Sequence, residues 1–217
     1  MLKRGLVAAL IAGMVTLCAF GFEGPVLTQV IYQATAYTLP AGVWELEGMF
    51  NLSAFGFPWA SLNYGLTENI QVSTGLTADL FGMPNLGIKL ALGRTGPVAL
   101  AASAGMTYFL ADGSLYLGSG LLASLQADGL GMHAGASLQA LPEFSISPYA
   151  AADYDLMPNT KLLTELNFLP LRARLGLLLR ALNSLDLRGW VSFFPFSLGA
   201  NLSLRFRGSD EEGAANP

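Results

Sequence analysis

The 217-residue chain is rich in apolar residues and poor in charge, with 53% hydrophobic and 12% charged residues and a formal net charge of −4. This composition is too apolar for an ordinary soluble protein. A helical membrane protein is excluded as well, because the longest weakly polar run after the N-terminus, residues 97–111, is shorter than the roughly 18 residues that a transmembrane helix needs. Another structure must therefore cover the apolar surface.

Residues 1–21 have the pattern of a secretory signal peptide, in which Lys3 and Arg4 precede a short apolar segment and a small-x-small cleavage site. The only cysteine, Cys18, lies inside this segment. A lipoprotein with Cys18 acylated is the alternative, although Leu17 stands where a small residue is wanted. Without Lys3 and Arg4, nine basic residues remain against 15 acidic ones, a net charge of −6. This balance argues against nucleic acid as a partner.

Residues 22–42 alternate weakly between apolar and polar and then meet a break at Leu39-Pro40-Ala41-Gly42. They fit an extra strand, a periplasmic lead-in or a segment tucked into a lumen. We expect the periplasmic lead-in.

From residue 43 onward the chain repeats one pattern, which is clearest between residues 64 and 92. Apolar and polar residues alternate strictly in residues 85–92, and such alternation is typical of a strand with one apolar and one polar face. Turn residues separate further segments of this kind. The predicted strands are 43–52, 58–66, 69–80, 85–92, 98–109, 114–126, 130–140, 146–155, 160–168, 171–181, 184–194 and 196–207.

Strands of about 9 to 11 residues, apolar outward and polar inward, are what a transmembrane β-barrel needs. In lipid such a sheet must also close, because unpaired edge groups find no water. We therefore predict an all-β fold, a closed antiparallel up-and-down transmembrane β-barrel over residues 43–207. It has about 12 strands, with ten as the alternative, and an even number would put both termini on the periplasmic side. Residues 208–217 are expected to form a disordered acidic tail.

The weakest strand prediction covers residues 170–182, where leucine is abundant and an amphipathic helix is the alternative. Arg172, Arg174 and Arg180 share one parity there, which favours a strand. Nearly all charged residues within the predicted strands likewise lie on the polar face. This placement is expected because an Arg or Lys that faces lipid at mid-depth costs about 2 to 4 kcal/mol. The predicted lumen-lining or pore-lining residues are Glu45, Glu47, Asp79, Lys89, Asp153, Asp155, Lys161, Glu165, Arg172, Arg174, Arg180, Asp186, Arg188, Arg205 and Arg207.

Closure of the last strand on the first would bring Arg205 and Arg207 to Glu45 and Glu47. A hairpin near residues 169–170 would likewise bring Glu165 beside Arg172 and Arg174. These charges fit a constriction that selects solutes, or a set of ion pairs that makes a polar interior tolerable. Other interior positions are small and fit either a narrow water path or tight curvature. They are Ser103, Gly105, Gly118, Gly120, Ser124, Gly131, Gly135 and Ser137.

The unit Tyr64-Gly65-Leu66-Thr67-Glu68-Asn69, followed by alternating residues, is similar to the strand-turn-strand units of bacterial outer-membrane β-barrels. Residues 39–207 resemble the small porin-like or transporter-type barrels, including those of the phenol meta-pathway type. The resemblance implies the bacterial outer membrane as location, with its lipid and its assembly machinery as partners. One departure is that Phe206 is not terminal, because Arg207 and ten polar or small residues follow it.

The predicted function is a passive channel for small polar solutes, with a structural barrel without conductance as the alternative. A less favoured alternative is an outer-membrane hydrolase that uses His133, the only histidine. Ser137 lies four residues along the same strand, about 13 Å away, which is too far for a hydrogen bond to His133. A serine from a neighbouring strand could still meet His133. We predict no enzyme activity, no cofactor and no metal, and the sequence sets no oligomeric state.

Overall fold

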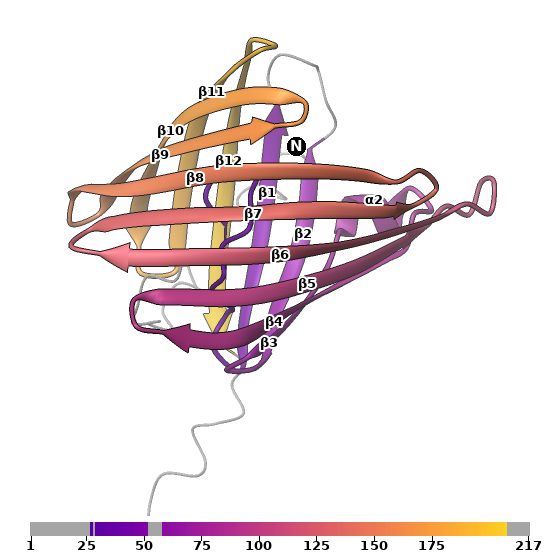
Figure 1. Ribbon diagram of the computed structural model, residues 1–217, viewed down its shortest axis with the longest axis horizontal. Helices are drawn as coiled ribbons and strands as arrows, with labels where there is room; N and C mark the ends of the chain where they lie inside the picture. The colour runs from indigo at the N-terminus through magenta and orange to yellow at the C-terminus, as the bar shows by residue number, and fades with distance from the viewer. Residues whose placement is uncertain (1–26, 28, 52–57, 208–217) are drawn as a thin grey trace, which may run out of the picture.

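Twelve strands and one short helix make up the computed structural model, which describes residues 27, 29–51 and 58–207. Each strand pairs antiparallel with its neighbours in sequence, and β12 pairs with β1, so that the sheet closes into a barrel (Figure 1). Within the described residues, no helix is long and apolar enough to cross a membrane. The elements are β1 (Val43–Asn51), β2 (Trp59–Thr67), β3 (Ile70–Thr74), α2 (Leu76–Leu80), β4 (Asn85–Thr95), β5 (Val98–Tyr108), β6 (Leu115–Ala127), β7 (Leu130–Leu141), β8 (Ser145–Met157), β9 (Thr160–Phe168), β10 (Leu171–Leu182), β11 (Leu185–Phe193) and β12 (Ser197–Arg207).

The predicted closed up-and-down barrel of about 12 strands is confirmed. The strand β10 pairs with β9 on one side and with β11 on the other, so the helical alternative for residues 170–182 is wrong. The predicted signal peptide and acidic tail lie outside the described residues.

The two faces of the sheet differ in the way that the alternation predicts. On β4, Leu86, Ile88 and Leu92 point outward with 57%, 46% and 55% of their surface exposed, whereas Lys89 between them is only 7% exposed. An apolar outer face around a polar interior is the arrangement of a barrel whose solvent is lipid.

The predicted strand 69–80 is wrong in its second half, where β3 ends at Thr74 and α2 follows. The Asp79 carboxylate accepts hydrogen bonds from the Thr74 hydroxyl at 2.8 Å and from the backbone and side-chain N–H groups of Asn85 at 3.1 and 3.0 Å. Such local bonds compete with the ladder of a sheet. Asp79 therefore lies exposed in a helix, not on the inner face of a strand as predicted.

The barrel has two different ends. On one side all five connections are two-residue turns, from β2 to β3, β4 to β5, β6 to β7, β8 to β9 and β10 to β11, and β1 begins and β12 ends there. On the opposite side only the connection from β9 to β10 is that short. We call the first side the turn end and the opposite side the loop end. Outer-membrane barrels carry their short turns on the periplasmic side.

Candidate functional site

The described residues before β1 lie inside the barrel. Residues 27 and 29–42, called the strap below, form the indigo segment behind β7 and β8 in Figure 1. Val30 and Ile31 are fully buried in a hydrophobic cluster with Leu163 of β9, Leu178 of β10 and Trp190 of β11. The expected periplasmic lead-in is therefore wrong for these residues, and the alternative of a segment tucked into the lumen is correct. The physical reason is that the apolar side chains of the strap are buried against apolar residues of the inner barrel wall.

Glu165 of β9 binds the backbone of the strap at residues 31–33. Its Oε1 atom accepts hydrogen bonds from the backbone N–H groups of Ile31, Tyr32 and Gln33 at 2.6, 2.6 and 2.8 Å. Its other oxygen accepts from the guanidinium of Arg174 at 3.0 Å, and this guanidinium lies 4.1 Å from the centre of the Tyr32 ring. Successive backbone N–H groups form a nest that binds anions. The predicted proximity of Glu165 and Arg174 is confirmed, and the pair anchors the strap.

Side chains from three other strands also hold the strap. The Leu39 N–H donates to the Gln71 side chain of β3 at 3.0 Å, and the Tyr149 hydroxyl of β8 donates to the carbonyl of Ala34 at 2.7 Å. The Lys89 ammonium of β4 donates to the carbonyl of Thr35 at 3.5 Å. The luminal wall therefore satisfies strap backbone groups that no sheet ladder reaches.

A further anchor is a line of polar side chains across β6 to β9. The Ala36 N–H donates to the Ser124 hydroxyl at 2.8 Å, and this hydroxyl lies 2.8 Å from Nδ1 of His133. The other ring nitrogen of His133 lies 2.8 Å from Asp153, whose second oxygen contacts the Lys161 ammonium at 2.6 Å. Lys161 also reaches Asp155 at 2.7 Å.

Serine, histidine and aspartate in hydrogen-bonded succession are the groups of a nucleophilic hydrolase. Ser124 is the neighbouring-strand serine that the sequence left open for His133. Ser124 is only 1% exposed, however, and its hydroxyl already accepts a strap N–H group. A substrate cannot reach this oxygen while the strap lies on it, so the arrangement fits an anchor and not a nucleophile.

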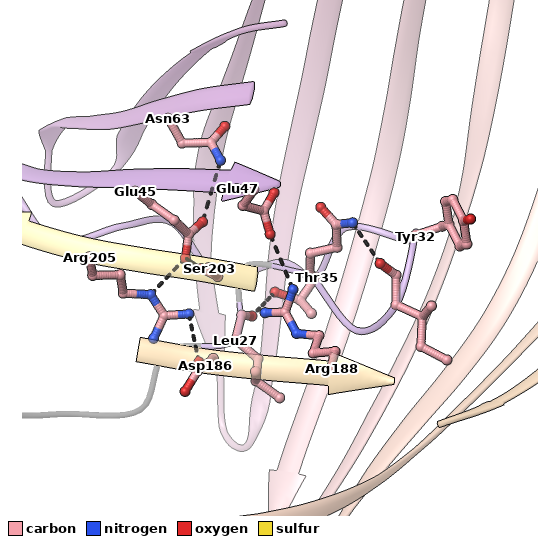
Figure 2. Close-up of polar contacts among 12 residues, drawn as sticks. Leu27, Tyr32, Thr35, Glu45, Glu47, Asn63, Asp186, Arg188, Ser203 and Arg205 are labelled. Carbon is pink, nitrogen blue, oxygen red and sulfur yellow. Dashed lines mark hydrogen bonds and ion pairs between the residues drawn. The ribbon is translucent and has the colours of Figure 1, made fainter. Parts of the chain in front are cut away.

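A network of buried charges closes the seam between β12 and β1, as Figure 2 shows. Arg205 lies directly opposite Glu45 in the register and donates to it at 2.6 Å, which confirms that predicted pair. Arg205 also lies 3.3 Å from Asp186, while Arg188 donates to Glu47 at 3.1 Å. Buried ion pairs are tolerable only with good geometry and further hydrogen bonds. Arg180, Ser203 and Asn63 supply such bonds to the carboxylates of this network.

The prediction that Arg207 also joins this network is wrong, because Arg207 lies opposite Val43 at the turn end and is exposed. Arg172 is likewise exposed, and Asn167 is its register partner on β9, in place of the expected Glu165. Parity sets the face of a residue but not its depth, so residues near strand ends reach the rim. Of the predicted residues, Glu45, Glu47, Lys89, Asp153, Glu165, Arg174, Asp186, Arg188 and Arg205 are buried, Lys161 and Arg180 are half-buried, and Asp79, Asp155, Arg172 and Arg207 are exposed.

The loop-end half of β4 to β8 is lined by small side chains instead of charges. Gly87, Gly105 and Gly118 lie side by side on three neighbouring strands. A cavity of about 620 Å³ opens in front of them. A second cavity, of about 560 Å³, lies at the turn end between the strap and the barrel wall, where Lys161 and Arg180 line it.

Three uncharged interior side chains that bind Glu45 or the strap are absent from the predicted lumen-lining residues, which are all charged. They are Asn63, Gln71 and Tyr149. They share the inward parity of their strands, which is the signal that would have found them, and so does the buried Asn201. Ser124 was predicted as a small interior position, and the structure adds its contact with the strap.

An apolar outer face, a closed ladder and a charged interior together define a transmembrane β-barrel of the outer-membrane type.

No protein-family model and no curated protein matches the chain. Among solved structures, the KdgM porin in complex with disordered oligogalacturonate is similar at a TM-score of 0.58 and 6% identity, over 76% of this chain and 99% of that one. The COG4313 outer membrane channel from Pseudomonas putida F1 is similar at a TM-score of 0.51 and 11% identity, over 79% of this chain and 98% of that one. The fold is thus that of outer-membrane porins and channels.

Proposed function

We propose that the protein is a passive channel for small polar solutes in the bacterial outer membrane. The observation that carries the proposal is a polar lumen with a cavity at each end, of about 620 Å³ at the loop end and about 560 Å³ at the turn end. The fold likeness to porins and channels supports it. Lipid is the partner of the outer face, and the assembly machinery of outer-membrane barrels would insert the chain.

The charged residues of the interior line the narrow section in this proposal. Glu165 with Arg174, Glu47 with Arg188, and Glu45 with Arg205 form ion pairs there, so acidic and basic groups lie paired in the wall of this section. Rings of charge set selectivity in pores, and paired charges favour small dipolar solutes over large ions of one sign. Neither catalysis nor a cofactor enters the proposal.

A structural barrel without conductance is the second candidate, and the strap is the observation that favours it. The strap fills the lumen between the two cavities with buried apolar side chains such as Val30, Ile31 and Leu39. A strap that never yields and leaves no path would block passage.

Planar-bilayer recording of the refolded full chain separates the two candidates. A channel gives discrete and reproducible current steps in potassium chloride. Heat-modifiable mobility on a gel reports in parallel that the barrel has formed. Folded barrels that insert without current steps would overturn the channel and leave the structural barrel.

A further inference from the structure

The loop-end cavity continues toward the strap into a smaller one of about 430 Å³. Both cavities share Gln29, Glu47, Trp59 and Ser61 in their walls, so the smaller one forms the floor of the larger. Asn201 of β12 lines only the floor. Gln29 and Tyr32 of the strap belong to the lining of this floor, so a solute that enters from the loop end meets the floor and the strap together.

Asn201 is only 3% exposed, and neither its amide nitrogen nor its carbonyl oxygen has a hydrogen-bond partner among the described residues. It lies between Met49 and Arg188 in the register of its neighbouring strands, on the inward face. A buried carboxamide normally satisfies both of its polar atoms. This one instead lines the floor cavity with both its donor and its acceptor unpaired by the described residues.

The surroundings select the kind of molecule that would pair with such a group. The Glu47 carboxylate is held by Arg188 at 3.1 Å, so the charge beside the cavity is balanced. Ser61 adds a hydroxyl, and the Trp59 ring adds an apolar wall. Adjacent hydroxyl groups donate and accept at neighbouring positions, and a volume of this size holds a small ligand.

We propose that Asn201 marks a binding subsite for a neutral polyhydroxylated solute, of sugar or polyol type, at the floor of the loop-end cavity. The inference rests on the proposed channel function and adds the class of solute that the channel takes. Asn201 pairs with two neighbouring hydroxyls of the solute, while the carbon skeleton lies against Trp59.

The test uses the refolded full chain and D-glucose as the probe. Saturation-transfer NMR measures glucose binding, and bilayer recording measures how glucose lowers the potassium chloride current. Asn201→Leu keeps the side-chain volume and is expected to weaken glucose affinity about tenfold, the effect of losing one to two hydrogen bonds. Gln139→Leu removes a carboxamide that lines the large cavity but not its floor. This control is expected to leave glucose affinity unchanged.

A second variant, Ser61→Phe, fills the floor from β2 without altering Asn201 and should abolish glucose binding. Unchanged glucose affinity in Asn201→Leu would overturn the subsite, and so would a full chain that conducts ions but binds no glucose. Glucose binding that depends on Asn201 in barrels without conductance would support the subsite and overturn the channel. The two proposals therefore fail in different ways.

Discussion

Two walls of the barrel interior share the alternation of outward-facing and inward-facing residues along their strands, but their inward-facing residues differ. The charged wall, formed by β1 and β9 to β12, carries the buried pairs of Glu45 with Arg205 and of Glu165 with Arg174. The small-residue wall, the loop-end half of β4 to β8, carries glycines such as Gly105 and Gly118 in front of an open cavity. Parity alone thus decides which residues face inward, whereas their size and charge decide whether the lumen there is filled or open.

The two walls also have different roles. The charged wall closes the seam and grips the strap, so its side chains are engaged with one another. The small-residue wall leaves space, so its side chains are free to meet solutes. Substitutions on the two walls should therefore have different consequences.

The largest effect is expected for Glu45→Leu on the charged wall. Glu45 is fully buried and holds Arg205 at 2.6 Å, so the substitution leaves a buried guanidinium without that partner. Breaking a buried pair costs about 3 to 5 kcal/mol. Denaturant unfolding in detergent micelles should show a loss of this size in the free energy of unfolding.

Ser103→Ala on the small-residue wall is the matched control and should change the free energy of unfolding by less than about 0.5 kcal/mol. Equal losses in the two variants would mean that the walls do not differ in the way described.

An intermediate effect is expected for Glu165→Gln, which removes the charge from the nest of three strap N–H groups. Charge-assisted hydrogen bonds are roughly twice as strong as neutral ones. A loss of about 1.4 kcal/mol would release the strap about ten times more often. Chymotrypsin should then cleave the folded protein about ten times faster at Tyr32 and Tyr37.

Glu143→Gln, in the exposed connection between β7 and β8, makes the same chemical change away from the strap and should leave the cleavage rate as it is. A Glu165→Gln variant that is cut no faster would show that the nest does not hold the strap.

The smallest effect is expected for Gly105→Leu on the small-residue wall. A Cβ atom at Gly105 would meet only the Leu86 carbonyl at 3.5 Å and the Cα atom of Gly87 at 3.8 Å, so the barrel should fold normally. The leucine side chain would enter the loop-end cavity and lower the single-channel conductance roughly twofold. Ala104→Leu, one residue away on the outer face, should not change it. A conductance that falls equally in both variants would place the path elsewhere.

Much of the fold follows from short-range pattern. Strict alternation on β4 predicts that Lys89 faces inward while Leu86 and Ile88 face outward, and the structure agrees. The shared parity of Arg174 and Arg180 predicts a strand where leucine content alone favours a helix. The pairing of Glu45 with Arg205 follows from closure, because the first and last strands of a barrel must meet.

The alternation does not predict how deep in the barrel a residue lies, nor which residues far away in the chain bind the strap. Arg172 and Arg207 have the inward parity but lie at the rims, and Asp79 folds back onto Thr74 and Asn85 instead of extending β3. The strap could not be placed from its own weak alternation. Its backbone is satisfied by Glu165, Ser124 and Gln71, which are 32 to 134 positions away in the chain.

Cysteine labelling along β4 tests the central claim most directly, in a Cys18→Ala background. Gly87 lines the loop-end cavity and Ala91 lines the turn-end cavity, whereas Ile88 and Leu90 point outward. Single cysteines at Gly87 and Ala91 should react with a charged, membrane-impermeant thiol reagent in lipid vesicles, and cysteines at Ile88 and Leu90 should not. Reaction at Ile88 and Leu90 with protection at Gly87 and Ala91 would contradict a water-filled interior enclosed by a lipid-facing outer surface.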